Sequence, residues 1–498
     1  MNPHYQQFSD NSPVLDDEHD SYVRSLCQEI SQHSESQRND KRPRLPYNSP
    51  GDIPRLDRVL NIDPVTMTVT VEANVTMGKL VVHTLHHNLL PSVVAPARNT
   101  TVADAFARIT HSPSSFAYGS FDCTVLKVHI ITENGELVRL RPDCTKSPCN
   151  DSTPATIPAA ERVKLFYGSA GTMHTLGLAT LFVISLVHRG PFVKLEFLPL
   201  SILRKQTKKM LHEHARNVRK GDKSLATSVA IMLAGTQLAR DPRGSRSGSS
   251  LLKASKNASL AFNKLRWAST DSSIEFLEAV LFMQSKPKVC EQTSGILIGR
   301  TDCQSSEMIL DTENFTQLVR AADKRRKIRV FYMPTIDYLF RNEIDKTLFA
   351  KRMPRATPAV NKSSYHSFGA HCDSAGSIVQ QLHDFGVNCP IQIYPTLSPK
   401  RIGRERSMGV GCAYNSWSDT SPCFFTLNFW HEGLDGKIDR YLNDDKTVPK
   451  GFRYLHSRAS CDLGEAWYHH DIKEYQRLRK FWVPHNRLPD VSERLWGP

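Results

Sequence analysis

The sequence lacks several patterns that would define a function class directly. Its 498 residues contain no uninterrupted apolar run of about 18 residues, so we expect no transmembrane helix. The first fifty residues have neither a basic start nor an apolar run, so we expect no signal peptide and a cytoplasmic protein. The absence of a Walker A loop, G-x-G-x-x-G, G-x-S-x-G and H-E-x-x-H removes the usual motif-based hypotheses for phosphate binding, serine hydrolysis and zinc proteolysis.

Cysteine and histidine give no disulfide or metal pattern. The eleven cysteines are an odd set without C-x-x-C spacing, which favours reduced thiols. The run HEH (212–214) lies in a basic segment, and HTLHH (83–87) has no carboxylates arranged around it. We therefore predict no metal site.

Positive charge is concentrated in one segment. The formal net charge is +14, and residues 201–266 contain fifteen Lys or Arg against three Asp or Glu. Aromatic residues, which stack on bases in nucleic-acid-binding surfaces, are almost absent there, so we predict no nucleic-acid partner. We expect a low-complexity insert at 204–262 that is either solvated or in peripheral contact with an anionic membrane.

Strands and helices are predicted in both halves of the chain, which indicates an α+β fold. The predicted helices cover residues 17–34, a segment capped by Thr76, and residues 471–482. The predicted strands include a half-buried one at 66–71 and others at 390–397 and 423–430. Asn134-Gly135 predicts a hairpin turn with two positive-φ positions.

The segment TVADAFARITHSPSSFAYGSFD (101–122) poses the main functional question. Its end, SSFAYGSFD, is typical of a loop that holds a large anionic or aromatic ligand. Its beginning is not, because no glycine occurs between Gly78 and Gly119, where close approach of the main chain to a ligand would favour one.

The order of motifs along the chain carries a family resemblance. VTMGKLV, SSFAYGSFD, ENGELVRL and LFYGSAGTMHTLGLAT follow one another, and SIEFLEAVLFM, CPIQIYPTL and FTLNFWHEG continue the pattern. This order resembles the FAD-binding domain of the vanillyl-alcohol-oxidase (PCMH) type, and within it the delta-24-sterol reductase (diminuto/seladin) family. The resemblance implies a two-lobed α+β fold, with a disordered tail at 1–15, an FAD-binding domain at 16–190, and a substrate or cap domain with an antiparallel sheet at 191–498.

The resemblance also implies a chemistry and the residues that serve it. NADH or NADPH would reduce FAD, and a hydride would then pass to a carbon–carbon double bond of an apolar sterol, terpenoid or polyketide of secondary metabolism. The implied cofactor contacts are Ser114, Ser115, Tyr118, Gly119, Gly171, Thr172, Gly177 and Thr180. The implied catalytic residues near the flavin are Tyr394, Asn428 and His456.

The phosphate-binding loops depart from the family's pattern. The family's triple glycine falls on Ala103, Asp104 and Ala105, and its later G-T-S-G falls on residues 108–111. A Cβ at such positions blocks the approach of main-chain N–H groups to a diphosphate, and Asp104 adds a like charge.

Two further departures agree with the first. The family's other phosphate loop matches only PYNSP (46–50), and His174 stands where the family has glycine. Arg108 could compensate by binding phosphate through its guanidinium. Two hypotheses stay open: an FAD-dependent oxidoreductase with a remodelled phosphate site, or a flavin-free relative that acts as a non-redox binder or as a cyclase using a general acid.

Overall fold

The fold is described from a computed structural model. The residues described are 17–36, 44–142, 157–199, 275–282, 293–302, 329–341, 363–371, 390–397, 423–432, 451–454 and 470–496, together with Ile378, Leu382, Phe385 and Val387. The predicted tail at 1–15, the basic segment at 204–262 and the candidate His456 lie outside these residues.

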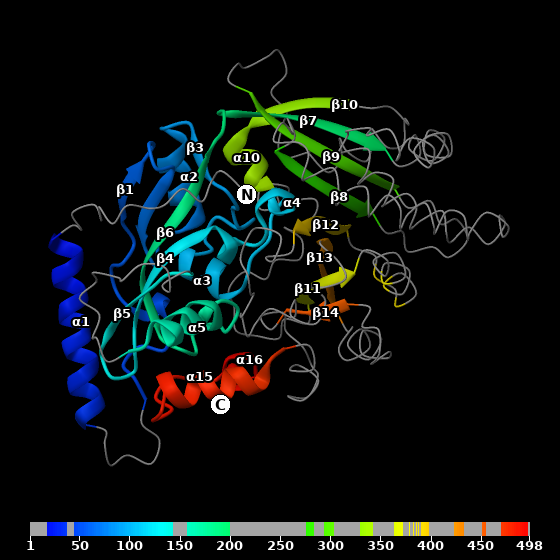
Figure 1. Cartoon of the computed structure of the whole chain (residues 1–498). Helices are drawn as coiled ribbons and strands as arrows, with labels where there is room; N and C mark the ends of the chain where they lie inside the picture. Colours follow the sequence, from blue (N-terminus) through cyan, green and yellow to red (C-terminus); the bar gives the residue numbers. More distant parts are fainter. Residues whose placement is uncertain are drawn as a thin grey trace.

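A six-stranded antiparallel sheet organises the first part of the chain (Figure 1). Its strands are β1 (Val59–Asp63), β2 (Thr68–Glu72), β3 (Leu89–Pro91), β4 (Val125–Ile131), β5 (Leu137–Leu140) and β6 (Leu178–His188). The order is β1-β2-β6-β4-β5, and β3 also pairs with the long strand β6. The strand predicted at 66–71 is thereby confirmed as β2.

Helices accompany this sheet. They are α1 (Asp17–Ser36), α2 (Met77–Leu85), α3 (Val102–Ala107), α4 (Ser115–Tyr118) and α5 (Ala159–Ser169), with short 3₁₀ turns η1 (Pro50–Asp52) and η2 (Phe121–Thr124). The predicted cap of α2 is confirmed, because the Thr76 side chain accepts a hydrogen bond from the Lys79 N–H.

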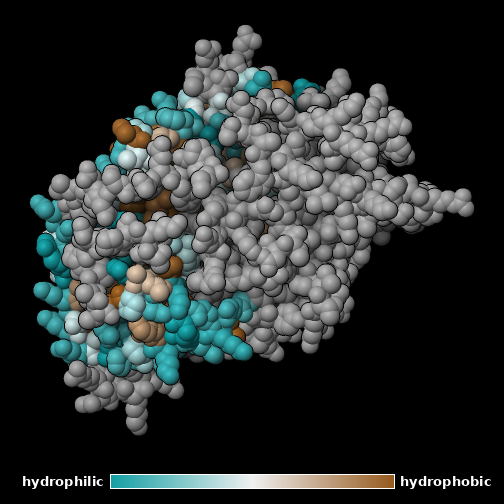
Figure 2. Space-filling view, in the orientation of Figure 1, coloured by the Kyte–Doolittle hydropathy of each residue, from teal (hydrophilic) through white to brown (hydrophobic). Residues whose placement is uncertain are grey.

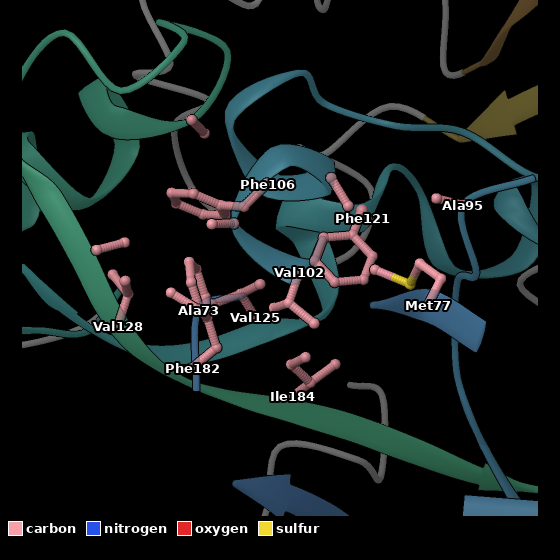
Figure 3. Close-up of a cluster of buried hydrophobic side chains, with 14 of the residues drawn as sticks. Ala73, Met77, Ala95, Val102, Phe106, Phe121, Val125, Val128, Phe182 and Ile184 are labelled. Carbon is pink, nitrogen blue, oxygen red and sulfur yellow. The ribbon is translucent and has the colours of Figure 1, made fainter. Parts of the chain in front are cut away.

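The apolar core lies between α3 and the sheet. Figure 3 shows Phe106 of α3 beside Phe182 of β6, with Val128 of β4 nearby. The Phe106 ring meets Phe182 edge-on with the ring centroids 5.4 Å apart, and it meets Phe166 of α5 at 6.0 Å. Aromatic rings favour such edge contacts, which fix α3 against the sheet.

The prediction that β2 is half-buried is wrong, because all five of its residues are buried. At the end of β2, His19 Nδ1 of α1 is 2.8 Å from Glu72 Oε1. Arg58 donates to the same carboxylate oxygen at 3.2 Å, so the charge of Glu72 is paired where the strand is covered. The Glu72 pKa is lowered, because these hydrogen bonds outweigh the effect of burial.

The predicted hairpin joins β4 and β5, but its turn differs from the prediction. Gly135 has a φ of +80°, whereas Asn134 is not among the residues with positive φ. The Gly135 N–H donates to the Thr132 carbonyl, and the Thr132 N–H donates to Glu136, so a four-residue turn ends in a single left-handed glycine. A Cβ on Gly135 would lie 2.4 Å from the Cys27 carbonyl of α1. The absence of a side chain at Gly135 therefore also permits close packing of this turn on α1.

An eight-stranded antiparallel sheet forms the other part of the described structure. Its strands are β7 (Phe192–Pro199), β8 (Phe276–Phe282), β9 (Thr293–Asp302), β10 (Arg329–Pro334), β11 (Ser363–His371), β12 (Pro390–Leu397), β13 (Cys423–Glu432) and β14 (Gly451–Arg453). The order is β10-β7-β9-β8-β12-β13-β11-β14. The short helix α10 (Thr335–Leu339) follows β10. Mixed helices and antiparallel sheets confirm the α+β class, while the assignment of this sheet as a cap over substrate stays a prediction.

The last described segment returns to the first sheet (Figure 1). It contains the predicted amphipathic helix, α15 (Ile472–Trp482), and α16 (Val491–Trp496). Leu478 packs so closely on α5 that a Cβ on Gly168 would lie 2.3 Å from its Cδ1. Figure 2 shows hydrophilic side chains over the outer surface of α1 and of these two helices.

A buried carboxylate fastens this segment. Glu133, in the β4–β5 turn, accepts hydrogen bonds from the His485 N–H at 2.7 Å and the Arg487 N–H at 3.1 Å. Arg487 in turn donates to the Ser34 carbonyl at the end of α1. Residues from both ends of the chain thus meet at one turn of the first sheet.

None of the helices in the described ranges combines the length and the apolar character that crossing a membrane requires.

Candidate functional site

The positions of the family's triple glycine do not offer free main-chain amides. The Ala103 N–H donates to the Ala73 carbonyl at 3.0 Å, the Asp104 N–H to Thr101 Oγ1 at 3.1 Å, and the Ala105 N–H to the Thr101 carbonyl at 2.9 Å. All three residues belong to α3, whose short turn is packed into the core. A main-chain cradle for a diphosphate is therefore absent at these positions.

Left-handed backbone occurs at residues with side chains, and one of them, His174, stands where the family has glycine. The two glycine positions of the later G-T-S-G do not share it, because Arg108 has a φ of −110° and His111 is not among the residues with positive φ. Ile109 has a φ of +51°, and Met173 and His174 have φ values of +52° and +63°. Left-handed backbone costs a residue with a Cβ about 1 to 2 kcal/mol, and more for a β-branched one such as Ile109. Of these three residues, only His174 therefore carries such strain at a family glycine position.

The predicted contacts in the segment 114–119 are engaged within the protein. Ser114 Oγ donates to the Ser92 carbonyl at 2.7 Å, and Ser115 Oγ accepts from the Ser112 N–H at 3.0 Å. Tyr118 Oη accepts a hydrogen bond from Arg189 at 3.3 Å. Gly119 has φ +78° and ψ −152°, a conformation that is essentially restricted to glycine.

The predicted contacts in the segment 171–180 have mixed environments. The Gly171 N–H donates to Phe106, and Thr172 Oγ1 donates to the Gly168 carbonyl at 2.9 Å. A Cβ on Gly177 would lie 2.3 Å from Ile130 Cγ2, so this glycine serves the packing of β6 on β4. Thr180 differs, because its buried hydroxyl has no hydrogen-bond partner within the described ranges.

Charged side chains gather where α3 meets the loop before β6. Asp104 Oδ1 lies 3.3 Å from His174 Nε2 and 3.8 Å from Arg108 Nη2. Arg494 of α16 donates to the Asn48 carbonyl, and Asp104 acts electrostatically on its pKa. We call Asp104, Arg108, His174 and Arg494 the Asp104 cluster. The Asp104–His174 contact brings together two of the three places where the sequence departs from the family's phosphate loops, and the third, PYNSP, meets Arg494 through the Asn48 carbonyl.

Burial and charge set the protonation of this cluster. Burial lowers the pKa of His174, although the hydrogen bond to Asp104 opposes that change. The pKa of Asp104 is lowered, because the hydrogen bond to His174 and the charge of Arg108 outweigh its burial. Asp104 is therefore a carboxylate at neutral pH, held by cationic and hydrogen-bonding groups.

A second candidate region is the buried polar face of the eight-stranded sheet. β12 and β13 pair in the register Gln392–Asn428 and Tyr394–Thr426, so these side chains share one face. All four are buried. Such a face is informative because buried polar groups are costly unless they are hydrogen-bonded or meet a ligand.

The structure brings the predicted Tyr394 and Asn428 together on this face. Tyr394 Oη donates to Gln392 Oε1 at 3.1 Å, and Asn428 Oδ1 accepts from Ser367 Oγ at 2.8 Å. The face also meets the loop of the first sheet, because Tyr454 Oη lies 3.3 Å from both Thr426 Oγ1 and His111 Nε2. The serine-rich loop and the candidate catalytic strands are thus neighbours.

Sequence reasoning missed a buried ion pair beside this face. Glu278 of β8 and Arg341, which follows α10, form a salt bridge with side chains that are 0% and 4% exposed. Tyr338 Oη donates to Glu278 Oε1 at 3.3 Å. Burial raises the Glu278 pKa while Arg341 opposes the rise, and the Glu278 charge keeps Arg341 protonated. The signal was a single acid in the apolar strand FLEAVLF.

These residues suit the polar groups of FAD through side chains and not through main-chain amides. The main-chain N–H groups at the triple-glycine positions already donate hydrogen bonds within the protein, so they cannot hold a diphosphate. The Asp104 cluster offers two guanidinium groups and an imidazole, which bind phosphate well. The unpartnered Thr180 hydroxyl offers a further buried polar contact.

Comparison with known proteins finds a family that part of this sheet and its loops resembles. Residues 52–141, which include β1 to β5 and the 101–119 segment, match the model of the FAD binding domain family. The predicted resemblance to a PCMH-type FAD-binding domain is confirmed for this part of the chain.

Individual relatives are similar at low identity. The decaprenylphosphoryl-beta-D-ribose oxidase of Mycolicibacterium smegmatis is 34% identical over 91 residues, which is 18% of this chain and 20% of that protein. Delta(24)-sterol reductases of Pisum sativum and Arabidopsis thaliana are each 29% identical over 149 residues, 30% of this chain and 24% of theirs. The matches thus span about a quarter or less of these relatives, and the family assignment of residues 191–498 stays a prediction.

Proposed function

We propose that the protein is an FAD-dependent oxidoreductase that acts on a carbon–carbon double bond of an apolar substrate. The observation that carries the proposal is the FAD binding domain at residues 52–141. The similarity to two delta(24)-sterol reductases supports a sterol, terpenoid or polyketide as the substrate class. NADPH or NADH is the proposed reductant.

The chain's own residues would divide the work between two regions. FAD, when bound, supplies hydride transfer. The Asp104 cluster would bind phosphate, and Thr180 would add a buried polar contact. Tyr394 and Asn428 would orient the reacting part of the substrate from the buried face of β12 and β13. His456, the third catalytic candidate, stays a prediction because it lies outside the described residues.

A proton must reach the second carbon of the double bond, and Tyr394 Oη is the proposed group that holds it. This hydroxyl is buried and donates to Gln392, so it is oriented by the neighbouring side chain of its own strand. The Glu278–Arg341 pair lies beside the same face and keeps its charges paired away from water. The surrounding sheet would exclude bulk water from the reacting carbon.

An absorbance spectrum of the purified full chain tests the proposal first. Flavin bands near about 370 and 450 nm, present after purification or after incubation with FAD, support it. Anaerobic NADPH or NADH should then bleach the longer-wavelength band. An unsaturated apolar substrate should restore that band and gain two hydrogens by mass spectrometry. Protein that stays colourless with excess FAD contradicts the proposal.

The variant Tyr394→Phe separates proton delivery from cofactor binding. It removes one hydroxyl and keeps the ring, so flavin content and bleaching by NADPH should match the wild type. Reoxidation by the unsaturated substrate should slow by about 100-fold or more, the usual scale of general acid catalysis. Equal reoxidation rates would remove Tyr394 from the catalytic role.

A flavin-free binder or cyclase is the second candidate function. One observation favours it: the main-chain N–H groups at the triple-glycine positions donate hydrogen bonds within the protein. The same absorbance experiment decides between the two, because this candidate requires folded protein that does not take up FAD.

A further inference from the structure

We propose that Asp104 is a built-in anion that competes with the cofactor's diphosphate for Arg108 and His174. The inference rests on the proposed function for the identity of the ligand as FAD. It goes beyond that function because it assigns a residue of the chain itself as the competitor, and because it predicts a gain of binding when this residue is changed.

The geometry gives Asp104 the environment of a bound anion. Its Oδ1 atom is 3.3 Å from the imidazole of His174 and 3.8 Å from the guanidinium of Arg108, on the next turn of the chain. Arg494 of α16 forms no ion pair with Asp104, although the Asp104 charge opposes the lowering of the Arg494 pKa by burial. A guanidinium from the end of α3 and an imidazole from the loop before β6 thus face one carboxylate.

The Arg494 guanidinium has spare capacity for a ligand. One of its nitrogens donates to the Asn48 carbonyl, and its buried Nε has no hydrogen-bond partner within the described residues. A guanidinium has five N–H donors and binds phosphate oxygens in pairs. A phosphate at this position would satisfy donors that the protein does not.

The carboxylate is also accessible enough to be displaced. The Asp104 side chain is 37% exposed and that of Arg108 is 54% exposed, whereas His174 is 10% exposed. A ligand can therefore reach the cluster from solvent, and the half-exposed Asp104 can leave it. Because a diphosphate carries the same sign of charge, a bound Asp104 opposes it by Coulomb repulsion.

The decisive variant is Asp104→Asn, measured in the full chain. Asparagine keeps a carbonyl oxygen toward His174 and removes the negative charge. The dissociation constants of FAD, from quenching of flavin fluorescence, and of ADP, from calorimetry, should both fall by about tenfold. Adding Arg108→Gln to Asp104→Asn should cancel this gain. Glu18→Gln is the matched control, because Glu18 is an exposed carboxylate of α1 that pairs with Arg58. The affinities of this variant for FAD and ADP should equal those of the wild type.

The possible results are distinct. Unchanged or weaker binding by Asp104→Asn overturns the inference, while FAD binding by the wild type would leave the proposed function standing. Tighter ADP binding by Asp104→Asn without uptake of FAD supports the inference for a nucleotide diphosphate and contradicts the proposed function. Circular dichroism of each variant, including Arg108→Gln alone, shows that the chains compared are folded.

Discussion

Gly177 offers the sharpest test of whether a family glycine serves the cofactor or the fold. Its φ of +153° disfavours residues with a side chain, and an added Cβ would lie 2.3 Å from Ile130 Cγ2 and 3.2 Å from the Ile131 carbonyl. Overpacking of this kind costs about 1 to 3 kcal/mol, and backbone strain adds about 1 kcal/mol or more. Gly177→Ala should therefore lower the free energy of unfolding of the FAD-free protein by about 3 kcal/mol.

Urea unfolding followed by tryptophan fluorescence measures this change, and a double-mutant cycle locates its cause. Ile130→Ala removes the Cγ2 atom that the new Cβ would contact. The loss of unfolding free energy in the double variant should therefore be smaller than the sum of the two single losses, by at least about 1 kcal/mol. Gly51→Ala is the control, because the nearest atom to its Cβ would be Ser49 Oγ at an ordinary 3.6 Å. Additive effects, or a Gly177→Ala loss below about 1 kcal/mol, would refute the packing role.

Two further predictions concern buried charge. His129 is buried and its Nε2 has no partner in the described part of the chain, and burial lowers its pKa well below 6.5. As the pH falls, His129 is therefore protonated in the unfolded chain at a higher pH than in the folded chain. The free energy of unfolding should fall by about 1.4 kcal/mol per pH unit as the pH drops below 6.5. His129→Leu should remove this part of the slope when urea midpoints at pH 7 and 5.5 are compared, and an identical slope would contradict it. Arg341→Met leaves Glu278 buried without its cation and should cost about 3 to 5 kcal/mol in urea unfolding. The double variant with Glu278→Leu should recover most of that loss, and failure to do so would mean that the pair contributes more than charge compensation.

Local sequence patterns predicted the elements of the first sheet well. They could not predict which surfaces are buried by residues that are distant in sequence. The Thr76 cap and the alternation before Glu72 depend on neighbours in sequence, so they can be found by inspection. Glu72, at the buried end of β2, is paired with His19, which is 53 residues away in sequence. The Asn134-Gly135 turn was found, but its predicted type was wrong, because only Gly135 of the two residues has a positive φ.

The candidate site shows the same division. The departures at Asp104 and His174 were visible in the sequence, yet their hydrogen bond joins residues 70 positions apart. Arg494 could not be connected with them, because nothing in its own neighbourhood indicates where α16 packs. Tyr394 and Asn428 were proposed from the resemblance, and only the strand register shows that they share a buried face.

The turn at Glu133 has a consequence for any attempt to divide the protein. Because the Glu133 carboxylate holds the main chain of residues 485–487, a single cut between β7 and β8 would give two pieces that stay associated without a peptide bond. The amino-terminal piece expressed alone would lack α15 and would expose the apolar surface at Gly168 that Leu478 covers. Co-expression of the two pieces, in contrast, should reconstitute the first sheet in its native packing.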